Sequence, residues 1–376
     1  MTGAFVRAAR RGTQQQVEHV SVVRAEAARG RVAEVYAQVE RDFGVLAPPV
    51  ILHSPAPDAL AAAWVMLRET LIATGKAGRA AKEAVAAAVS HGNTCPYCVD
   101  VHGTMLHGLV QGGDATAVAG GRFEAIADPH LRAVAGWARD CGTAAGASPP
   151  FPAAQGPELA GVAVVFHYYN RMVNVFLGTS PFPPGTPARL RGGLMRLAGR
   201  VMRPAATRHR APGESLGLLP PAPLPADLAW AAGTPAVAEA LARSAAAIER
   251  GGERSVPAAV RALVETALAG WDGRPPGLSR AWAADALSVL PRRELPAGRL
   301  ALLTAMASYQ VDRPAVEDFR RDGAGDVALV ELTSWAAMAA ARRVGGRLTP
   351  AEGTKHEERR QPGGGGDTLD LPIDAG

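Results

Sequence analysis

The residues of this chain that could carry out chemistry are concentrated in the stretch EAVAAAVSHGNTCPYCVDVHGTMLH, which begins at Glu83. Two of the three cysteines, Cys95 and Cys98, form a C-x-x-C pair here. His102 follows Cys98 by four residues, so both side chains project from one face of a helix. Ser90 follows Glu83 by seven residues, which places them on one face of the preceding Ala/Val-rich helix. Two thiols, an imidazole and a carboxylate are the components of a thiol redox site.

A helix is expected to begin inside NTCPYC. Asn93 or Thr94 can cap it, and Pro96 suits its first turn, where the missing N–H costs nothing. With Cys95 at the cap, Cys98 lies in the first turn of the helix. Free N–H groups and the positive end of the helix dipole favour a thiolate there. We therefore expect a low-pKa thiol at this position.

The register of these residues resembles one protein family. Glu83, a cysteine twelve residues later and C-x-x-C-x-x-x-H ending at His102 resemble the alkylhydroperoxidase AhpD family, part of the carboxymuconolactone decarboxylase-like superfamily. The resemblance is closest over roughly residues 50–180, and it implies a small all-helical fold. AhpD itself has a histidine between the cysteines where this chain has Tyr97, so the proton relay is expected to differ. Decarboxylases of the superfamily generally lack the cysteine pair.

The resemblance implies a role for each of the four residues. Cys98 would attack the peroxide, Cys95 would resolve the sulfenic acid, and His102 and Glu83 would relay protons. Peroxide reduction needs these parts: a thiolate nucleophile, a proton for the leaving oxygen and a second thiol that traps the sulfenic acid. Geometry alone leaves the order of the thiols open, because Cys95 at the cap could be the more exposed one. No cofactor is required, and a lipoyl or thioredoxin-like dithiol protein would supply the electrons.

Other interpretations of the motif are weighed against redox chemistry. C-x-x-C-x-x-x-H supplies three zinc ligands, and His91, Asp100 or His107 could supply a fourth. A structural zinc site usually has two ligand pairs, however, and the second pair is missing, so no metal is expected. The alternative functions are a carboxymuconolactone decarboxylase-like enzyme acting on a small acid or lactone, and a non-enzymatic thiol redox sensor or scaffold.

Several neighbouring residues have both a structural and a functional interpretation. In isolation, Glu83 would be expected to pair with Lys82 or Arg79. The segment HYYNRMVNVFLG carries polar side chains among apolar neighbours, as in a helix that lines a polar pocket or one whose polar groups satisfy helix ends or a subunit interface. The second interpretation is preferred, because most buried polar side chains are simply hydrogen-bonded. These polar residues are Asn170, Arg171 and Asn174. Of the remaining candidates, Tyr97 is expected to form a pocket wall, and Ser90 and Asn93 are expected to cap helices or assist the relay. His107 is expected on the surface, and Cys141 is expected to be a buried small hydrophobe.

Length and composition predict a helical protein with two domains or one doubled domain. The chain has 376 residues, of which 48% are hydrophobic and 5% aromatic. Frequent Ala, Leu and Arg favour helices, and no sustained alternation of β-branched residues appears. We therefore predict an all-α protein. The resemblance further implies an AhpD-like fold, here expected as two tandem helical units, and a homo-oligomer. The net charge of +5 comes almost entirely from arginine and accompanies no nucleic-acid-binding signature, so no nucleic-acid partner is expected.

Changes in composition predict the domain boundaries. In order, we expect a lead-in over 1–45, a redox domain over 46–180, a Pro/Arg-rich linker over 181–225, a degenerate helical repeat over 226–346 and a disordered tail over 347–376. Within the linker, apolar residues at helical spacing predict a basic amphipathic helix that packs on the protein as a linker or lid. Its apolar residues are Leu190, Leu194, Leu197 and Val201.

The second unit is predicted from a weak internal match. Overlaying ASYQVDRPAVEDFR on VSHGNTCPYCVDVH aligns Ser308 with Ser90, Pro314 with Pro96 and Asp318 with Asp100. The redox residues have no counterparts at the matching positions. Ala301, Arg313, Val316 and Arg320 stand there, in the order of Glu83, Cys95, Cys98 and His102. The second unit is therefore expected to contribute packing and no redox chemistry.

Targeting signals are not evident in the sequence. The segment MTGAFVRAARRGTQQQ lacks the apolar core of a signal peptide, and the longest apolar run is too short to span a bilayer. Three cysteines in so long a chain do not form a disulfide framework. We therefore expect a cytoplasmic protein with no membrane partner, and in that compartment a C-x-x-C pair is more often catalytic or metal-binding than structural.

Overall fold

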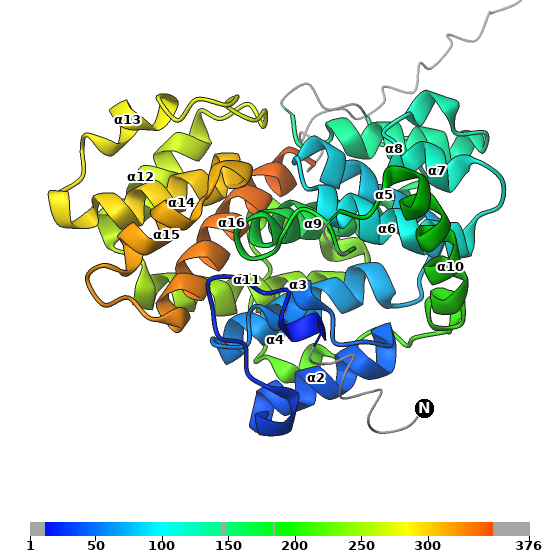
Figure 1. The fold of residues 1–376 in the computed structure, drawn as a ribbon, viewed down its shortest axis with the longest axis horizontal. Coiled ribbons are helices and arrows are strands. Elements are labelled where there is room, and N and C mark those ends of the chain that lie inside the picture. The colour runs from blue at the N-terminus through cyan, green and yellow to red at the C-terminus, as the bar shows by residue number, and fades with distance from the viewer. Residues whose placement is uncertain (1–11, 144–147, 183–184, 349–376) are drawn as a thin grey trace, which may run out of the picture.

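The computed structural model describes residues 12–143, 148–182 and 185–348 (Figure 1). Within these ranges the protein is all-α, as predicted, and one isolated antiparallel bridge joins Val17 to Leu177. The α-helices are α2 (Gly30–Phe43), α3 (Pro48–Ile51), α4 (Pro57–Leu67), α5 (Arg79–Gly92), α6 (Pro96–Leu109), α7 (Asp114–Ala119), α8 (Pro129–Asp140), α9 (Gly156–Phe176), α10 (Ala188–Thr207), α11 (Pro235–Ser255), α12 (Ala258–Ala269), α13 (Trp282–Leu287), α14 (Leu295–Ala307), α15 (Arg313–Arg320) and α16 (Asp326–Leu348). The shorter helices are η1 (Ala25–Ala27), η2 (Arg68–Ile72), η3 (Phe123–Ala125), η4 (Ala153–Gln155), η5 (Leu216–Leu218), η6 (Ala226–Gly233), η7 (Arg292–Glu294) and η8 (Ser308–Gln310).

Helix α9 runs through the middle of the molecule (Figure 1). It is buried along almost its whole length, because its own residues are largely apolar on every face. Helices α5 and α6 pack against α9 from the N-terminal half, and α14 and α16 pack against it from the C-terminal half. The polar residues of α9 therefore lie between the two predicted units.

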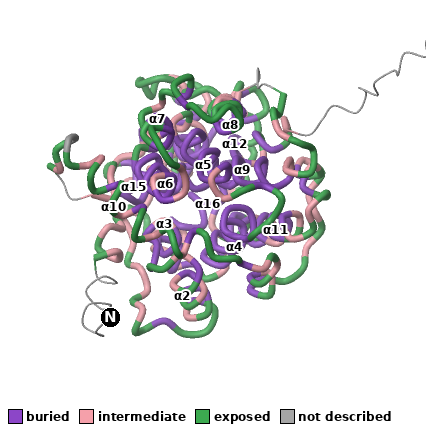
Figure 2. Tube along the Cα trace, turned by 90° about the vertical axis from the view of Figure 1, so that its right-hand side faces the viewer, coloured by how far each residue is buried: buried purple, intermediate pink, exposed green. Residues whose placement is uncertain are grey.

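One hydrophobic core serves both halves of the chain (Figure 2). It extends from Ala28 to Val344, and the contacts of α4 with α11 and of α9 with α16 bridge the predicted linker. The matched helices are neighbours in each half, since α5 packs on α6 and α14 packs on α15. That the second half is a degenerate copy of the first remains a prediction.

The turn between α5 and α6 differs from the expected cap. Cys95 is the N-cap residue of α6 and Pro96 begins the helix, as expected, but neither Asn93 nor Thr94 caps it. Asn93 follows the last turn of α5, and its side chain turns toward α9. Thr94 has a φ of 53°, an uncommon conformation for a residue with a Cβ, which lets the chain reverse within three residues. This tight reversal holds the cysteines against α5.

The end of α4 widens into η2, a π-helical turn built around the buried Arg68. Its guanidinium pairs with Asp42 at 2.8 Å, Glu69 at 2.7 Å and Glu214 at 2.5 Å. These ion pairs connect α2, η2 and the segment that follows α10. Leu71 in this turn lines the cavity that Cys98 and His102 also line, and π-helical turns often occur near functional sites.

Helix α10 packs on α6 over the cavity, but its predicted apolar face points the other way. Gly108 of α6 and Gly199 of α10 allow the two backbones to touch, since a Cβ on either glycine would clash with the other helix. Met195 is buried against α6, while Ala198 and Met202 line the cavity. The residues predicted to pack, Leu190, Leu194, Leu197 and Val201, are 42–73% exposed. The helical spacing correctly predicted that these four residues share one face of α10. That face is exposed, however, because the Gly108–Gly199 contact turns a different face of α10 toward α6.

The described part of the lead-in is bonded to the body of the protein. The Glu18 N–H donates to Phe176 O at 2.8 Å, and the Val23 N–H donates to Ser54 Oγ at 2.8 Å. Helix α2 buries Val32, Val35, Tyr36 and Val39 along one face. From residue 349 onward the predicted tail lies outside the described residues. Among the helices of the described ranges, none has the length and apolar character needed to cross a membrane.

Candidate active site

The four predicted site residues meet where α5 and α6 pack together. His102 Nδ1 lies 2.6 Å from Glu83 Oε2, and the Arg79 Nε–H donates to Glu83 Oε1 at 2.7 Å. Glu83 is completely buried and His102 is 5% exposed. Glu83 therefore pairs with Arg79, as expected for a helix carboxylate taken in isolation, and with His102, its expected partner in the proton relay.

These partners determine the protonation of Glu83. Burial alone would raise the pKa of this carboxyl, but the charges and hydrogen bonds of Arg79 and His102 outweigh burial and hold the pKa below its usual value. An ionised Glu83 requires a proton on the nitrogen that faces it. The Nδ1–H of His102 therefore donates to Glu83, which leaves Nε2 to exchange protons with the cavity.

Cys95 and Cys98 are free, buried thiols three residues apart at the start of α6. Burial raises the pKa of Cys98 well above its usual value, and the neighbouring Cys95 thiol raises it further, whereas the polar side chains of Asn170 and Ser90 lower it. The expected low-pKa thiol is therefore wrong for the reduced protein, because loss of solvation outweighs the helix N-terminus. The expectation that Cys95 is the more exposed thiol is also wrong: Cys95 is 1% exposed and Cys98 is 3% exposed.

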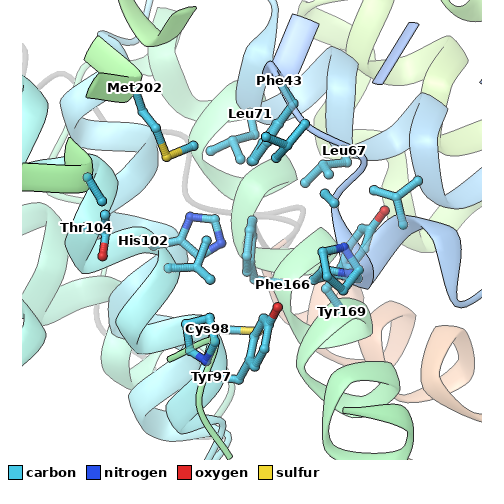
Figure 3. A pocket seen from close by; sticks show the side chains of 18 of the residues that line it. Phe43, Leu67, Leu71, Tyr97, Cys98, His102, Thr104, Phe166, Tyr169 and Met202 are labelled. Carbon is cyan, nitrogen blue, oxygen red and sulfur yellow. The ribbon is translucent and has the colours of Figure 1, made fainter. Parts of the chain in front are cut away.

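Cys98 and His102 line a cavity of about 230 Å³ (Figure 3). Both side chains project from α6 toward the space, which Phe43 and Leu71 close on the other side. Cys95 is not among the described residues that line it. The full lining is Phe43, Val45, Ala47, Pro48, Pro49, Val50, Leu67, Leu71, Tyr97, Cys98, Val101, His102, Thr104, Phe166, Tyr169, Pro181, Phe182, Ala198 and Met202.

Two aromatic residues shape the reactive end of the cavity. Phe166 packs its ring against the edge of His102, with centroids 4.5 Å apart and planes at 87°. Tyr97 forms a wall, as predicted, and its hydroxyl donates to Gln16 Oε1 at 2.9 Å. Burial raises the pKa of Tyr97. Nothing in the sequence pointed to Phe166, because a single aromatic residue in an apolar helix has no distinguishing pattern.

The polar residues of α9 divide between the two halves of the protein. Asn170 donates to Ser90 Oγ at 2.9 Å in α5, whereas Asn174 donates to Ser308 Oγ at 3.0 Å beyond α14. Arg171 donates through Nε to Ala305 O at 2.8 Å, near the end of α14. Arg171 and Asn174 therefore fit the preferred interpretation, in which buried polar side chains are simply hydrogen-bonded. Asn170 instead bonds to Ser90 and Asn93, at the end of α5 and in the turn that leads to the cysteines.

The other candidate residues lie elsewhere. His91 bonds to Val118 O at 2.9 Å through Nε2, and Asp100 accepts from Ser180 at 3.0 Å. His107 is half-buried near α10. Cys141 is buried, as expected, and burial raises the pKa of its thiol to about 12. Among the residues that the structure describes, no group of three or more His, Cys, Asp or Glu side chains is arranged to hold a metal ion.

Comparison with known proteins places this site in a family. No family model matches the chain. The chain is 40% identical over 331 residues to the protein named alkyl hydroperoxide reductase Rv2159c from Mycobacterium tuberculosis (strain ATCC 25618 / H37Rv). The match covers 88% of this chain and 94% of the relative, so it includes the cysteine helices, α9 and most of the second half. The chain therefore belongs to the same family as this mycobacterial alkyl hydroperoxide reductase.

Proposed function

We propose that this protein is a thiol-dependent peroxidase that reduces organic hydroperoxides through Cys95 and Cys98. The name of its mycobacterial relative supports the reaction class. One observation carries the proposal: Cys98 lines an apolar cavity beside a buried Glu83–His102 pair, with the buried Cys95 three residues earlier at the N-cap of the same helix. This arrangement brings together a nucleophile, a proton carrier and a resolving thiol.

The first half-reaction takes place at Cys98. His102 Nε2 accepts the thiol proton, and the resulting thiolate attacks one oxygen of the hydroperoxide. The O–O bond breaks, Cys98 becomes a sulfenic acid, and the leaving alkoxide takes the proton back from His102 to form an alcohol. Glu83 stabilises the imidazolium while it carries the proton. The peroxide gains two electrons, which the sulfur loses.

The second half-reaction restores the thiols. Cys95 loses its proton and attacks the Cys98 sulfur, which releases water and forms a Cys95–Cys98 disulfide. A dithiol partner, which we propose to be a lipoyl or thioredoxin-like protein, then supplies two electrons and two protons. Cys95 suits the resolving role because it is buried three residues before Cys98 but is not among the described lining residues of the cavity.

The cavity favours an organic hydroperoxide over hydrogen peroxide. Its volume of about 230 Å³ far exceeds the roughly 10–15 Å³ that a water molecule needs, and its walls are aromatic and aliphatic. An alkyl group would displace water from these walls, whereas hydrogen peroxide would leave most of the cavity wet. The described lining contains no lysine or arginine, so the cavity offers no strong partner for the carboxylate of a decarboxylase substrate.

Turnover assays with the three single cysteine variants test the proposal. With tert-butyl hydroperoxide and a dithiol reductant, Cys98→Ser should lose turnover, because the attacking sulfur is gone. Cys95→Ser should still consume one equivalent of peroxide and accumulate a sulfenic acid that dimedone traps. Cys141→Ser is the matched control and should behave like the parent. Turnover by Cys98→Ser would overturn the proposal, and disulfide formation without turnover with any dithiol would favour the redox sensor.

A further inference from the structure

Helix α10 turns a row of large apolar side chains toward solvent. The row consists of Leu190, Leu194, Leu197 and Val201, which are 42–73% exposed. Four of the eight exposed large hydrophobic residues in the described ranges lie in this row. At 1.5 Å per residue the row runs about 17 Å along the helix. Single exposed hydrophobics are normal, but such a concentration on one helix face marks a binding surface.

The charge beside this row has a single sign. The sequence has seven arginines and no aspartate or glutamate between positions 188 and 210. Arg196, Arg200 and Arg203 are exposed, and at 3.6 residues per turn they form a second row that flanks the apolar one. Within the described ranges, the ion pairs of this stretch involve Arg191 and Arg210 instead. The three exposed guanidinium groups therefore have no acidic partner among the described residues and can bind an anionic ligand.

Contacts on the opposite side hold α10 in this orientation. The helix lies at the edge of the molecule and packs on α6 (Figure 1). A Cβ on Gly199 would lie 2.5 Å from Thr104 O, so the two backbones touch at a point where no larger side chain fits. Met195 is buried in the same contact, against Gly103. Turning the leucines and Val201 inward would break this fit, so the apolar row is a permanent surface feature of the folded protein.

We propose that α10 docks this protein on the surface of an anionic lipid bilayer, with the apolar row among the acyl chains and the arginines on the lipid phosphates. Leucine and valine on one side of a helix, with arginines beside them, form the pattern of helices that lie in the membrane interface. Each arginine near an anionic leaflet strengthens binding, and burial of the apolar row adds to it. We expected no membrane partner from the sequence, and the exposure of the row in the structure is what changes this expectation.

Charge favours a lipid surface over a second copy of this chain. In a two-fold dimer through α10 the same rows would meet, so the arginines of one copy would face those of the other. The stretch from 188 to 210 offers no carboxylate to pair with them, and facing like charges are unfavourable. An acidic protein would satisfy the arginines, but it would also need an apolar row of matching length and shape. A fluid bilayer with anionic headgroups supplies both the phosphates and the apolar phase without a matched shape.

The position of the cavity gives this docking a consequence for the substrate. Ala198 and Met202 of α10 line the cavity (Figure 3). The cavity therefore lies within about one helix diameter, 10–12 Å, of the docked surface. This proximity makes hydroperoxides of membrane acyl chains the substrate class. That step rests on the proposed function, whereas the docking itself needs no redox chemistry.

The test is co-sedimentation of the full chain with lipid vesicles and needs no peroxide. The protein should bind phosphatidylcholine vesicles that contain phosphatidylglycerol and should not bind pure phosphatidylcholine, and high salt should weaken the binding. Leu197→Ser and Val201→Ser should each reduce the partition coefficient by about tenfold, because each removes one buried apolar side chain. Arg200→Gln should reduce it by about fivefold, the loss of one charge at an anionic surface. Leu278→Ser and Arg250→Gln are the matched controls, because both residues are exposed outside α10, and they should bind like the parent.

Several results would overturn the docking. Absence of vesicle binding, equal binding to neutral vesicles, or equal losses in the control variants would each do so. If the protein binds no vesicles and Leu197→Ser dissociates a homo-oligomer in size-exclusion chromatography, the row is an interface between copies. Binding to polyglutamate but not to vesicles would assign the arginines to an acidic protein. A protein that turns over tert-butyl hydroperoxide but binds no vesicles overturns the docking alone, whereas one that binds anionic vesicles and never turns over peroxide overturns the proposed function alone.

Discussion

His102 of α6 and Glu83 of α5 are joined by a 2.6 Å hydrogen bond, although nineteen residues separate them in the chain. The pair is formed in the reduced protein and is buried beside the cavity. Arg79 holds the second carboxylate oxygen, so Glu83 has one orientation and presents one oxygen to the imidazole. The proton carrier of the proposed reaction is therefore positioned before a substrate enters.

Removing either member of this pair should slow peroxide reduction. Glu83→Gln and His102→Gln should each reduce the rate of Cys98 oxidation by about 10–100-fold, the lower part of the range for general acid–base groups. Stopped-flow measurement with tert-butyl hydroperoxide would give the rate. Glu34→Gln on the exposed face of α2 provides the control and should not differ from the parent. Equal rates in all four proteins would rule out the relay.

The same carboxylate should make stability depend on pH. The pKa of Glu83 lies below its ordinary value of 4.5, so its ionised form stabilises the fold above that pH, and this contribution is lost as the pH falls through the lowered pKa. Glu83→Gln should cost on the order of 3 kcal/mol at pH 7, because it leaves charged partners unpaired. The stabilities of both proteins, measured by denaturant titration, should converge as the pH falls from 4.5 through the lowered pKa of Glu83. A difference that persists undiminished in acid would show that packing, not charge, explains the loss.

Mild oxidation should join the two thiols of the motif. Both cysteines are free, and a three-residue separation at a helix start allows a disulfide. After one equivalent of peroxide, intact-protein mass spectrometry should detect the loss of two hydrogens, and peptide mapping should assign the bond to Cys95 and Cys98. Either single Cys→Ser variant should lack this product. A bond to Cys141 instead would contradict the assignment.

Filling the cavity should discriminate between substrates. Ala198→Phe places a ring in the cavity from α10, so KM for cumene hydroperoxide should rise by about tenfold, the effect of losing roughly 1.4 kcal/mol of apolar contact. The KM for hydrogen peroxide should change much less, because it fills little of the space. Leu197→Phe places the same ring on the neighbouring, 61% exposed position and should alter neither value. Parallel increases for both peroxides would indicate that the cavity does not select the substrate.

The second half should tolerate changes at the positions that match the redox residues. Arg320 bonds to His19 O and pairs with Asp326, both at 2.5 Å, and these contacts are partly exposed. Arg320→Ala should therefore lower stability by about 0–1 kcal/mol and leave peroxidase activity unchanged. Arg313→Ala should do the same for activity. A specific loss of turnover in either folded variant would assign chemistry to the second half.

The sequence by itself determined the helical class and the local arrangement of the thiols. The proline after Cys95 predicted where α6 begins, and the four-residue step from Cys98 to His102 put both on one face. These features depend on neighbours within a turn or two, which is the range over which helix propensity and side-chain direction act.

Tertiary structure decided the ionisation and surroundings of the same residues. Cys98 is not a low-pKa thiol in the reduced protein, because the packing of α9 and the cavity wall removes its water. The face of α10 that packs follows from a backbone contact at Gly199, a feature that hydrophobic spacing cannot report. Asn170 reaches Ser90 and Asn93 from a helix far along the chain. Solvation, close backbone contact and long-range hydrogen bonds depend on which surfaces meet, and a local pattern carries no such information.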